Sequence, residues 1–147
     1  MKKFKFRFQT ILDIRVRDLE KAELLVAEAQ HKVLEAKQTL ENLRAEHKKN
    51  QTFLKKTLTA GTKIDIQTIS NTQNYLVALD KRMENQHIVI KEKEHMLAEI
   101  RQEMLLVRQK KLMMDKLKEN DFKQYKKDYE MEEMKQLDEM ASSRYKK

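Results

Sequence analysis

The chain contains a single glycine, Gly61, and no proline among its 147 residues. Glycine and proline are the residues that most often mark turns, so a chain nearly without them has few places at which it can reverse. Apolar residues recur at helical spacing on both sides of Gly61. These features predict two very long helices joined by one reversal, an architecture that favours contacts with other proteins over an enclosed catalytic pocket.

Two heptad series define the predicted seam of the first helix. The first series is Leu12, Leu19, Val26, Val33, Leu40, His47 and Leu54, and the second is Phe8, Arg15, Ala22, Ala29, Ala36, Leu43 and Asn50. Alternating spacings of three and four residues are typical of a left-handed coiled coil. We therefore predict a helix over about residues 4–58.

The second half of the chain repeats this pattern. Its series are Ile69, Leu76, Met83, Ile90, Leu97 and Met104, and then Thr72, Leu79, Gln86, Lys93, Ile100, Val107 and Met114. Further apolar residues widen the stripe, which indicates either partner contact or ordinary broadening of the seam. They are Val89, Met96, Leu105, Leu106, Leu112 and Met113. We predict a helix over about residues 66–138, followed by a frayed tail, because isolated helices are marginal in water.

The connection is predicted at about residues 59–65, with Gly61 as the C-terminal cap of the first helix. Thr62 and Asp65 are both candidate N-caps for the second helix. A connection this short makes the helices antiparallel neighbours. The predicted fold is therefore a single all-α domain over residues 1–147, an antiparallel two-helix coiled-coil hairpin with a C-terminal helical overhang.

Folding the chain near residue 61 pairs residues whose numbers sum to about 122, and a shift of one heptad either way also fits. The pairs this predicts are Leu43 with Leu79, Val33 with Val89, Val26 with Met96, Ala36 with Gln86, and Ala29 with Lys93. The small alanines would thus leave space for polar side chains of the second helix. Residues after about 120 would have no partner in the first helix, an overhang of about 26 residues or about 40 Å.

Composition excludes several classes of protein. The absence of cysteine leaves no disulfide framework and no thiolate metal site. No apolar run approaches the roughly 18 residues of a spanning helix. The basic N-terminus resembles a signal peptide, but Asp13, Arg15 and Arg17 interrupt any apolar region, so we expect a cytoplasmic protein.

Catalytic motifs are absent from the sequence. One glycine cannot form a phosphate-binding loop or a dinucleotide fingerprint. The four histidines, His31, His47, His87 and His95, lack metal-ligand spacing. His47 lies on the seam, where a polar residue that sets the register is the favoured interpretation. We expect no enzymatic activity, no cofactor and no metal.

Two aromatic groups are candidate contact residues. Phe4, Phe6 and Phe8 alternate with basic residues, and they either form a short anchor for a membrane or protein surface or simply open the seam. Phe122, Tyr125 and Tyr129 lie in the overhang and are favoured as protein-contact anchors over base-stacking residues.

The net charge of +8 is concentrated in the first arm, where residues 1–60 carry 14 basic and 8 acidic groups. Such a surface fits nucleic acid, anionic lipid or an acidic protein ring, or it is a solvated helix face.

Several short motifs resemble the flagellar export protein FliJ family. The opening residues 6–15 read Phe-Arg-Phe-Gln-Thr-Ile-Leu-Asp-Ile-Arg, residues 75–79 read Tyr-Leu-Val-Ala-Leu, and residues 137–141 read Leu-Asp-Glu-Met-Ala. Together with the chain length and the mid-chain glycine, these motifs extend the resemblance over essentially the whole sequence.

The resemblance implies an antiparallel two-helix coiled coil similar to the central stalk of rotary ATPases. It implies a role in the bacterial flagellar type III export apparatus, which serves flagellum biogenesis, motility and chemotaxis. The implied partners are the hexameric export ATPase, the cytoplasmic domain of the export gate protein and export chaperones, with no nucleic acid. The implied location is peripheral, at the inner face of the cell membrane.

The resemblance also implies two contact sites. The end that enters the ATPase ring would hold Phe8, Phe122, Tyr125 and Tyr129. The gate-facing patch would hold Leu43, Tyr75 and Leu79. Other positions of that patch are aromatic or histidine in better-known members, whereas here they are Glu46, Asn50 and Gln86.

Two other functions fit the residues. One is a generic structural coiled-coil scaffold, and the other is a basic rod that binds membrane or nucleic acid. The second predicts strong, salt-sensitive binding to DNA.

Overall fold

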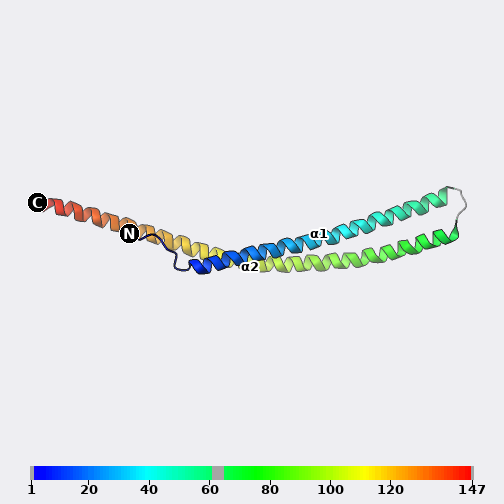
Figure 1. Cartoon of the computed structure of the whole chain (residues 1–147), viewed down its shortest axis with the longest axis horizontal. Helices are drawn as coiled ribbons and strands as arrows, with labels where there is room; N and C mark the ends of the chain where they lie inside the picture. The colour runs from blue at the N-terminus through cyan, green and yellow to red at the C-terminus, as the bar shows by residue number, and fades with distance from the viewer. Residues whose placement is uncertain (1, 61–64, 147) are drawn as a thin grey trace. The chain divides into compact units, whose positions relative to one another are not determined.

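The computed structural model describes residues 2–60 and 65–146, and within them the chain forms two helices and no strand. Helix α1 spans Gln9–Thr59 and helix α2 spans Ile66–Tyr145. The two helices run side by side in opposite directions (Figure 1). The predicted antiparallel two-helix hairpin is confirmed. Gly61 and Thr62 lie outside the described residues.

Helix α1 begins at Gln9, five residues later than the sequence predicted. Residues 2–6 are not helical, and the Gln9 amide donates to the Phe6 carbonyl at 3.2 Å where the helix starts. Phe6 is buried, and its ring meets that of Phe8 edge-on at a centroid distance of 6.0 Å. The helix therefore starts after the buried Phe6, whose side chain is packed while its backbone is non-helical.

Helix α2 begins with a cap from Asp65. Asp65 Oδ1 accepts the Gln67 amide at 3.1 Å, and Asp65 Oδ2 accepts the Thr68 hydroxyl at 2.9 Å. The first of these bonds satisfies a backbone amide that has no partner within the first turn. Of the two N-caps that the sequence allowed, the structure therefore confirms Asp65.

The chain divides into two compact units, which we describe separately. The inner unit is Leu24–Gln102, and the terminal unit combines Met1–Glu23 with Glu103–Lys147. Whether the chain is a single domain, as the sequence suggested, stays a prediction.

The inner unit has an apolar seam built from the predicted heptad positions. Ala29, Val33 and Leu97 form one buried cluster, against which Val26 and Ile100 pack. A second cluster holds Ala36, Leu40 and Ile90, with Met83 and Val89 beside it. Leu79 is the most buried side chain, with no exposed surface.

The predicted register holds to within about one or two helical turns in the inner unit. Gln86 Nε2 donates to the Ala36 carbonyl at 2.9 Å, which confirms that pair. Ala29 and Lys93 border the same small groove, as expected, although Ala29 also packs on Leu97. Polar side chains of α2 thus lie where the alanines of α1 leave room.

The predicted pair of Val33 with Val89 is displaced from this register, whereas Val26 packs in the cluster of Leu97, the residue next to its predicted partner Met96. Val33 and Val26 both pack in the cluster of Leu97, whereas Val89 packs beside the other cluster. Because antiparallel helices interleave their layers, one residue contacts two partners about a turn apart. A single pairing sum therefore describes the seam only approximately.

The terminal unit has a more polar seam. Leu12 is buried on α1, but the half-buried positions of α2 beyond Met114 include charged residues. They are Asp115, Lys118 and Asp121. Lys118 Nζ donates to Gln9 Oε1 at 2.9 Å across the helix pair. The seam here is closed by polar contacts as much as by apolar packing.

Helix α2 continues to Tyr145, beyond the predicted boundary at residue 138. Every residue from 126 to 146 is exposed. With no apolar partner for its stripe, this segment is held by hydrogen bonds within its own helix, from backbone and side chains alike. Fraying of this segment, which we call the tail (residues 126–146), stays a prediction.

Candidate functional site

An aromatic cluster in the terminal unit joins the N-terminal segment to α2. The Phe4 ring lies 5.3 Å from the Phe122 centroid, edge-on, and 5.4 Å from that of Tyr125. Tyr125 stands 6.4 Å from Phe122 and 6.3 Å from Tyr129. The Tyr125 hydroxyl also donates to the Lys2 carbonyl at 2.7 Å. Three of the four residues predicted for the ring-facing end are thus linked through Tyr125, which contacts Phe122, Tyr129 and Phe4.

Phe8, the fourth of those residues, lies apart from this cluster. It is half-buried against Phe6, and the Arg7 guanidinium lies 5.3 Å above its ring. A cation over an aromatic face is held by the ring quadrupole. Phe8 therefore belongs to the start of α1, and Phe6 with it opens the seam.

The N-terminal segment also changes the predicted overhang. The sequence analysis left residues after about 120 without a partner, but Phe4 covers part of Phe122 and Tyr125. An open groove runs between the segment and α2, lined by Lys2, Lys3 and Lys5 on one side. On the other side stand Asp121, Asp128 and Glu132. The uncovered part of α2 therefore begins after Tyr125 rather than after residue 120.

Sequence reasoning missed this contact of Phe4. The signal was present in the register, because 4 and 122 sum to nearly the value predicted for paired residues. The extended segment then continues the pairing of α1 without being helical.

Tyr129 is the most exposed tyrosine of the aromatic cluster, 38% exposed. A hydrogen bond with Glu133, one turn further along α2, raises the pKa of its phenol. Nearby, Lys123 pairs with Glu119 at 2.7 Å and lowers the pKa of that carboxyl. These exposed pairs within one helix fix side-chain positions but contribute little to stability.

The predicted gate-facing patch lies in the inner unit, and its residues differ in exposure. Leu43 and Tyr75 are half-buried, whereas Leu79 has no exposed surface. Leu79 is therefore a core residue, and a partner can touch only Leu43 and Tyr75. This burial agrees with the heptad position of Leu79.

Tyr75 is tied to α1 by a hydrogen bond that its sequence did not reveal. Its phenol donates to a carboxylate oxygen of Glu46. That bond, followed by partial burial, raises the pKa of Tyr75 above its ordinary value, and Arg82 opposes the shift. Glu46 thus holds the aromatic ring at the edge of the seam.

A second polar contact between the helices lies next to this one. His47 Nε2 stands 3.0 Å from Asp80 Oδ1, and the His47 side chain is 19% exposed. The predicted role of His47 as a polar seam residue is therefore supported by a named partner. Glu46 and His47 are neighbours on α1, and their partners Tyr75 and Asp80 both belong to α2.

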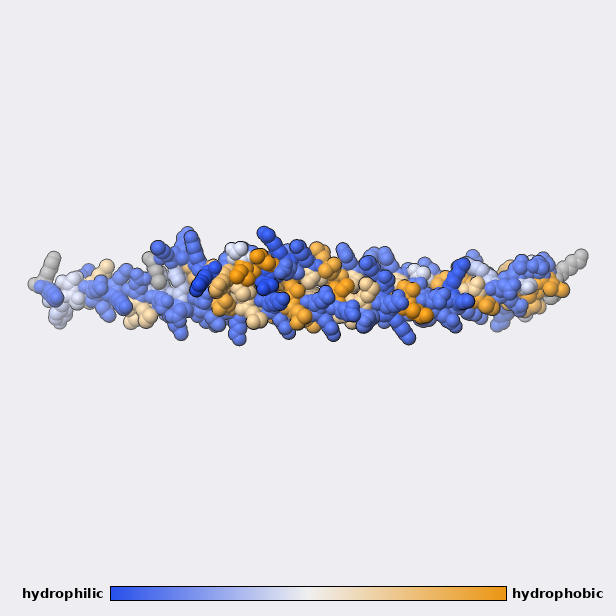
Figure 2. Space-filling view, turned by 90° about the horizontal axis from the view of Figure 1, so that it is seen from below, coloured by the Kyte–Doolittle hydropathy of each residue, from blue (hydrophilic) through white to orange (hydrophobic). Residues whose placement is uncertain are grey.

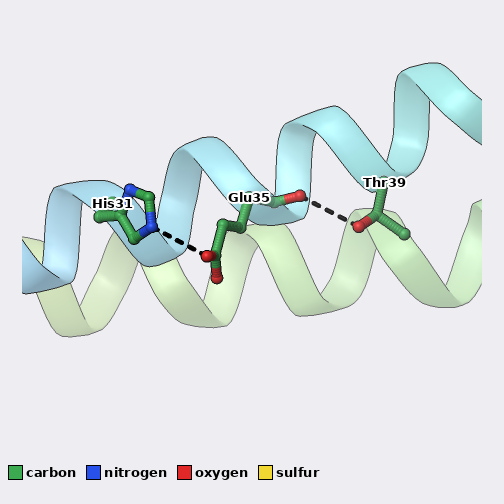
Figure 3. A network of polar contacts seen from close by, with 3 residues as sticks. All are labelled: His31, Glu35 and Thr39. Atoms are coloured by element: carbon green, nitrogen blue, oxygen red, sulfur yellow. Dashed lines mark hydrogen bonds and ion pairs between the residues drawn. The ribbon is translucent and has the colours of Figure 1, made fainter.

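The other histidine contacts are confined to single helices. His31 contacts Glu35 at 2.9 Å, and the Thr39 hydroxyl donates to the Glu35 carbonyl at 3.0 Å (Figure 3). His95 pairs likewise with Glu99 at 3.1 Å. All of these side chains are exposed, so they describe a solvated helix surface and not a site.

Residues 2–60 and 65–146 contain no group of three or more potential metal ligands. Nor do these residues include a helix long and apolar enough to cross a membrane. The surface in Figure 2 shows apolar side chains emerging between hydrophilic ones, which suits binding to other macromolecules.

Comparison with known proteins identifies a family. The family model described as flagellar FliJ protein matches residues 4–147. No curated protein and no solved structure matches the chain. The match extends over both helices and confirms the resemblance that the short motifs indicated.

Proposed function

The chain belongs to the family of flagellar FliJ proteins, and from this premise we propose that it couples an export ATPase ring to an export gate without being an enzyme. Family membership implies involvement in flagellar export. The proposed place of work is the cytoplasmic side of the cell membrane, next to the export gate. Export chaperones are further proposed partners.

The observation that carries this proposal is the unburied apolar surface of the tail. Met131, Met134, Leu137 and Met140 are each more than half exposed. A helix that leaves such a stripe open, beside the partly covered rings of Phe122 and Tyr125, suits a partner that surrounds it. A hexameric ring is a partner of this kind, and Tyr129 is the aromatic residue that we propose contacts it.

The proposed gate contact is the edge formed by Leu43 and Tyr75, supported from beneath by the buried Leu79. Tyrosine is enriched among the residues that dominate binding energy at interfaces, so Tyr75 is the proposed anchor of this edge. Glu46 is a carboxylate at a patch position that is aromatic or histidine in better-known members, which we expect to weaken the affinity for the gate.

The first test measures ATP hydrolysis by the cognate hexameric export ATPase. We expect added chain to raise the hydrolysis rate, and the chain alone to hydrolyse no ATP. Tyr129→Ala should reduce this stimulation, while Leu34→Ala, at an exposed apolar residue of the inner unit, should leave it unchanged. The absence of any stimulation by the unaltered chain would disprove the coupling role.

The second test separates the gate patch from the seam. Leu43→Asp should weaken binding to the gate domain, measured by calorimetry, by a larger factor than it lowers the folded fraction, measured by circular dichroism. Leu34→Asp adds the same charge at a 64% exposed position and is the matched control. Equal losses of binding and folding in Leu43→Asp would mean that Leu43 serves only the seam.

A further inference from the structure

A basic surface lies on α1 of the inner unit, near the end of that helix. A shallow groove on this surface is lined by Ala45, Lys48, Lys49, Thr52, Phe53 and Lys56. Phe53 is 50% exposed, and Lys55 is also exposed next to Lys56. We call Phe53 and the four lysines, Lys48, Lys49, Lys55 and Lys56, the lysine patch.

The lysine patch lies in a stretch of chain that has almost no acidic groups. Residues 47–60 hold four lysines and no carboxylate, and residues 65–79 of α2 hold only Asp65. The preceding carboxylate on α1, that of Glu46, accepts a hydrogen bond from the Tyr75 phenol. None of the four lysines forms an ion pair with any residue that the structure describes. The positive charge of the patch is therefore uncompensated within the described part of the chain.

The dipole of α1 accounts for only part of this charge. Lys56 lies in the last turn of the helix, where a cation complements the negative end of the dipole. That effect falls off within one turn. Lys48 and Lys49 precede the helix end at Thr59 by about three turns. The position of these two lysines therefore needs another explanation.

Exposed apolar side chains accompany the lysines at this end of the helix pair. Leu58 is 53% exposed near the end of α1, and Ile66, the first residue of α2, is 80% exposed. Large apolar side chains exposed among lysines are typical of a helix that lies in the interfacial region of a membrane. The long stem of a lysine lies along the apolar region there, while its ammonium group reaches the headgroups.

The composition of the patch favours lipid over other anionic partners. Every basic group in residues 47–60 is a lysine, and lysine is depleted at protein interfaces, where arginine is enriched. Nucleic acid would bind the lysines through its phosphates, but this electrostatic contact gains nothing from exposed Leu58 and Ile66. An anionic bilayer surface attracts the lysines and also accepts the apolar side chains.

We propose that the lysine patch, together with Leu58 and Ile66, binds the surface of a membrane that contains anionic lipids. Phe53 enters the boundary between headgroups and acyl chains, while the lysines stay among the headgroup phosphates, so the chain contacts the bilayer without crossing it. This inference rests on the proposed place of work at the membrane. Lipid binding is measured on the chain alone, so its failure and a failure to stimulate the ATPase are separate results.

Sedimentation of the full chain with lipid vesicles tests the proposal. Phosphatidylcholine vesicles that contain about 30% phosphatidylglycerol should bind the chain at least about twentyfold more tightly than vesicles of phosphatidylcholine alone. Raising the salt from about 0.1 M to about 1 M should release the chain, because the Debye length falls from about 10 Å to about 3 Å. Absence of binding, or equal binding to the two kinds of vesicle, would overturn the proposal.

Paired charge removals separate the lysine patch from the general basicity of the chain. Lys55→Gln with Lys56→Gln should weaken binding to the anionic vesicles about twenty-five-fold, since each lysine near an anionic surface contributes about fivefold. Lys81→Gln with Lys91→Gln removes the same charge from exposed positions of α2 in the inner unit, and it should change binding less than about twofold. Equal losses in the two double variants would mean that only net charge matters, and the patch would then have no special role.

The absence of tryptophan allows a direct test of insertion. The fluorescence maximum of Phe53→Trp should move to shorter wavelength when anionic vesicles are added, because the indole leaves water for an apolar interface. Leu34→Trp, at a 64% exposed position of α1, should show no shift. No shift for Phe53→Trp, or the same shift for both variants, would contradict the proposed insertion.

Two further results would assign the lysine patch to a different partner. If Lys55→Gln with Lys56→Gln weakened binding to the gate domain and left vesicle binding unchanged, the patch would contact a protein. If the same variant weakened binding to duplex DNA and left vesicle binding unchanged, the partner would be nucleic acid. Circular dichroism checks that each variant is as helical as the unaltered chain, so that either result speaks against lipid and not for a loss of folding.

Discussion

The two units of the chain share one heptad pattern but differ in how much of it they bury. Of the nine buried apolar side chains among the described residues, seven lie in the inner unit, and only Phe6 and Leu12 lie in the terminal unit. The buried positions of the inner-unit seam hold leucine, isoleucine, valine and alanine, with polar residues such as Gln86 half-buried beside them, whereas the terminal unit places the charged residues Asp115, Lys118 and Asp121 at half-buried positions. The difference indicates that stability is concentrated in the inner unit and that the terminal unit keeps surface open for partners.

The largest expected difference is in hydrogen exchange. Amides of the tail, residues 126–146, should exchange at least about a hundred times faster than amides near Leu79 and Ile90, because local opening costs little where nothing packs. Mass spectrometry of peptides measures both. Equal protection of the two segments would contradict both the predicted fraying and the contrast between the units.

The next largest effect is the loss of packing in the inner unit. Leu79→Ala should lower the free energy of unfolding by about 3 kcal/mol, because the removed side chain is completely buried. Val77→Ala lies two residues away on α2 at a 66% exposed position, and it should change stability by less than about 0.5 kcal/mol. Urea denaturation followed by circular dichroism measures both variants. Similar losses of unfolding free energy in the two variants would mean that packing around Leu79 does not contribute more to stability than an exposed position does.

A smaller effect is expected at the aromatic cluster of the terminal unit. Phe4→Ala removes two aromatic contacts, each worth about 0.5–1.5 kcal/mol, and should free the N-terminal segment from α2. Trypsin cleavage after Lys2, Lys3, Lys5 and Arg7 should then accelerate about fivefold, because cleavage follows the population of the open form. Phe53→Ala, at a half-exposed phenylalanine of the inner unit, should leave these cleavages unchanged. An unchanged rate in Phe4→Ala would show that the rings do not hold the segment.

The same contrast explains what could be predicted from the sequence. The seam of both helices followed from heptad spacing, because a helix periodicity determines which side chains face a neighbour. Every residue of the predicted series, from Phe8 to Met114, is buried or half-buried. The Asp65 cap was predictable for a similar reason, since capping depends on residues two and three positions away.

Contacts that depend on irregular backbone were not predictable in this way. Phe4 and Phe6 are predicted as the first turn of a helix, but contacts with Phe122 and Tyr125, far along the chain, hold the segment in a non-helical path. The Tyr75–Glu46 hydrogen bond depends on the rotamers of both side chains, and heptad spacing does not determine rotamers. Both contacts belong to the candidate sites, so the sites were less predictable than the fold.

The smallest expected effect separates a polar contact between the helices from one within a helix. In both cases a carboxylate that accepts a hydrogen bond from the phenol raises the pKa of the tyrosine. The carboxylate is that of Glu46 for Tyr75 and that of Glu133 for Tyr129. Because the folded pKa of Tyr75 lies above the unfolded value, its contribution to stability is present below pH about 10 and is lost as the pH rises through the folded pKa. The difference in urea midpoint between the unaltered chain and Tyr75→Phe should thus be constant from about pH 7 to pH 9 and should shrink above about pH 10.

Tyr129→Phe should show no such difference, because its bond lies within α2 in a segment that α1 does not contact. A pH-dependent difference for Tyr129→Phe as large as that for Tyr75→Phe would mean that the terminal unit unfolds together with the inner seam, and the division of labour between the two units would then be wrong.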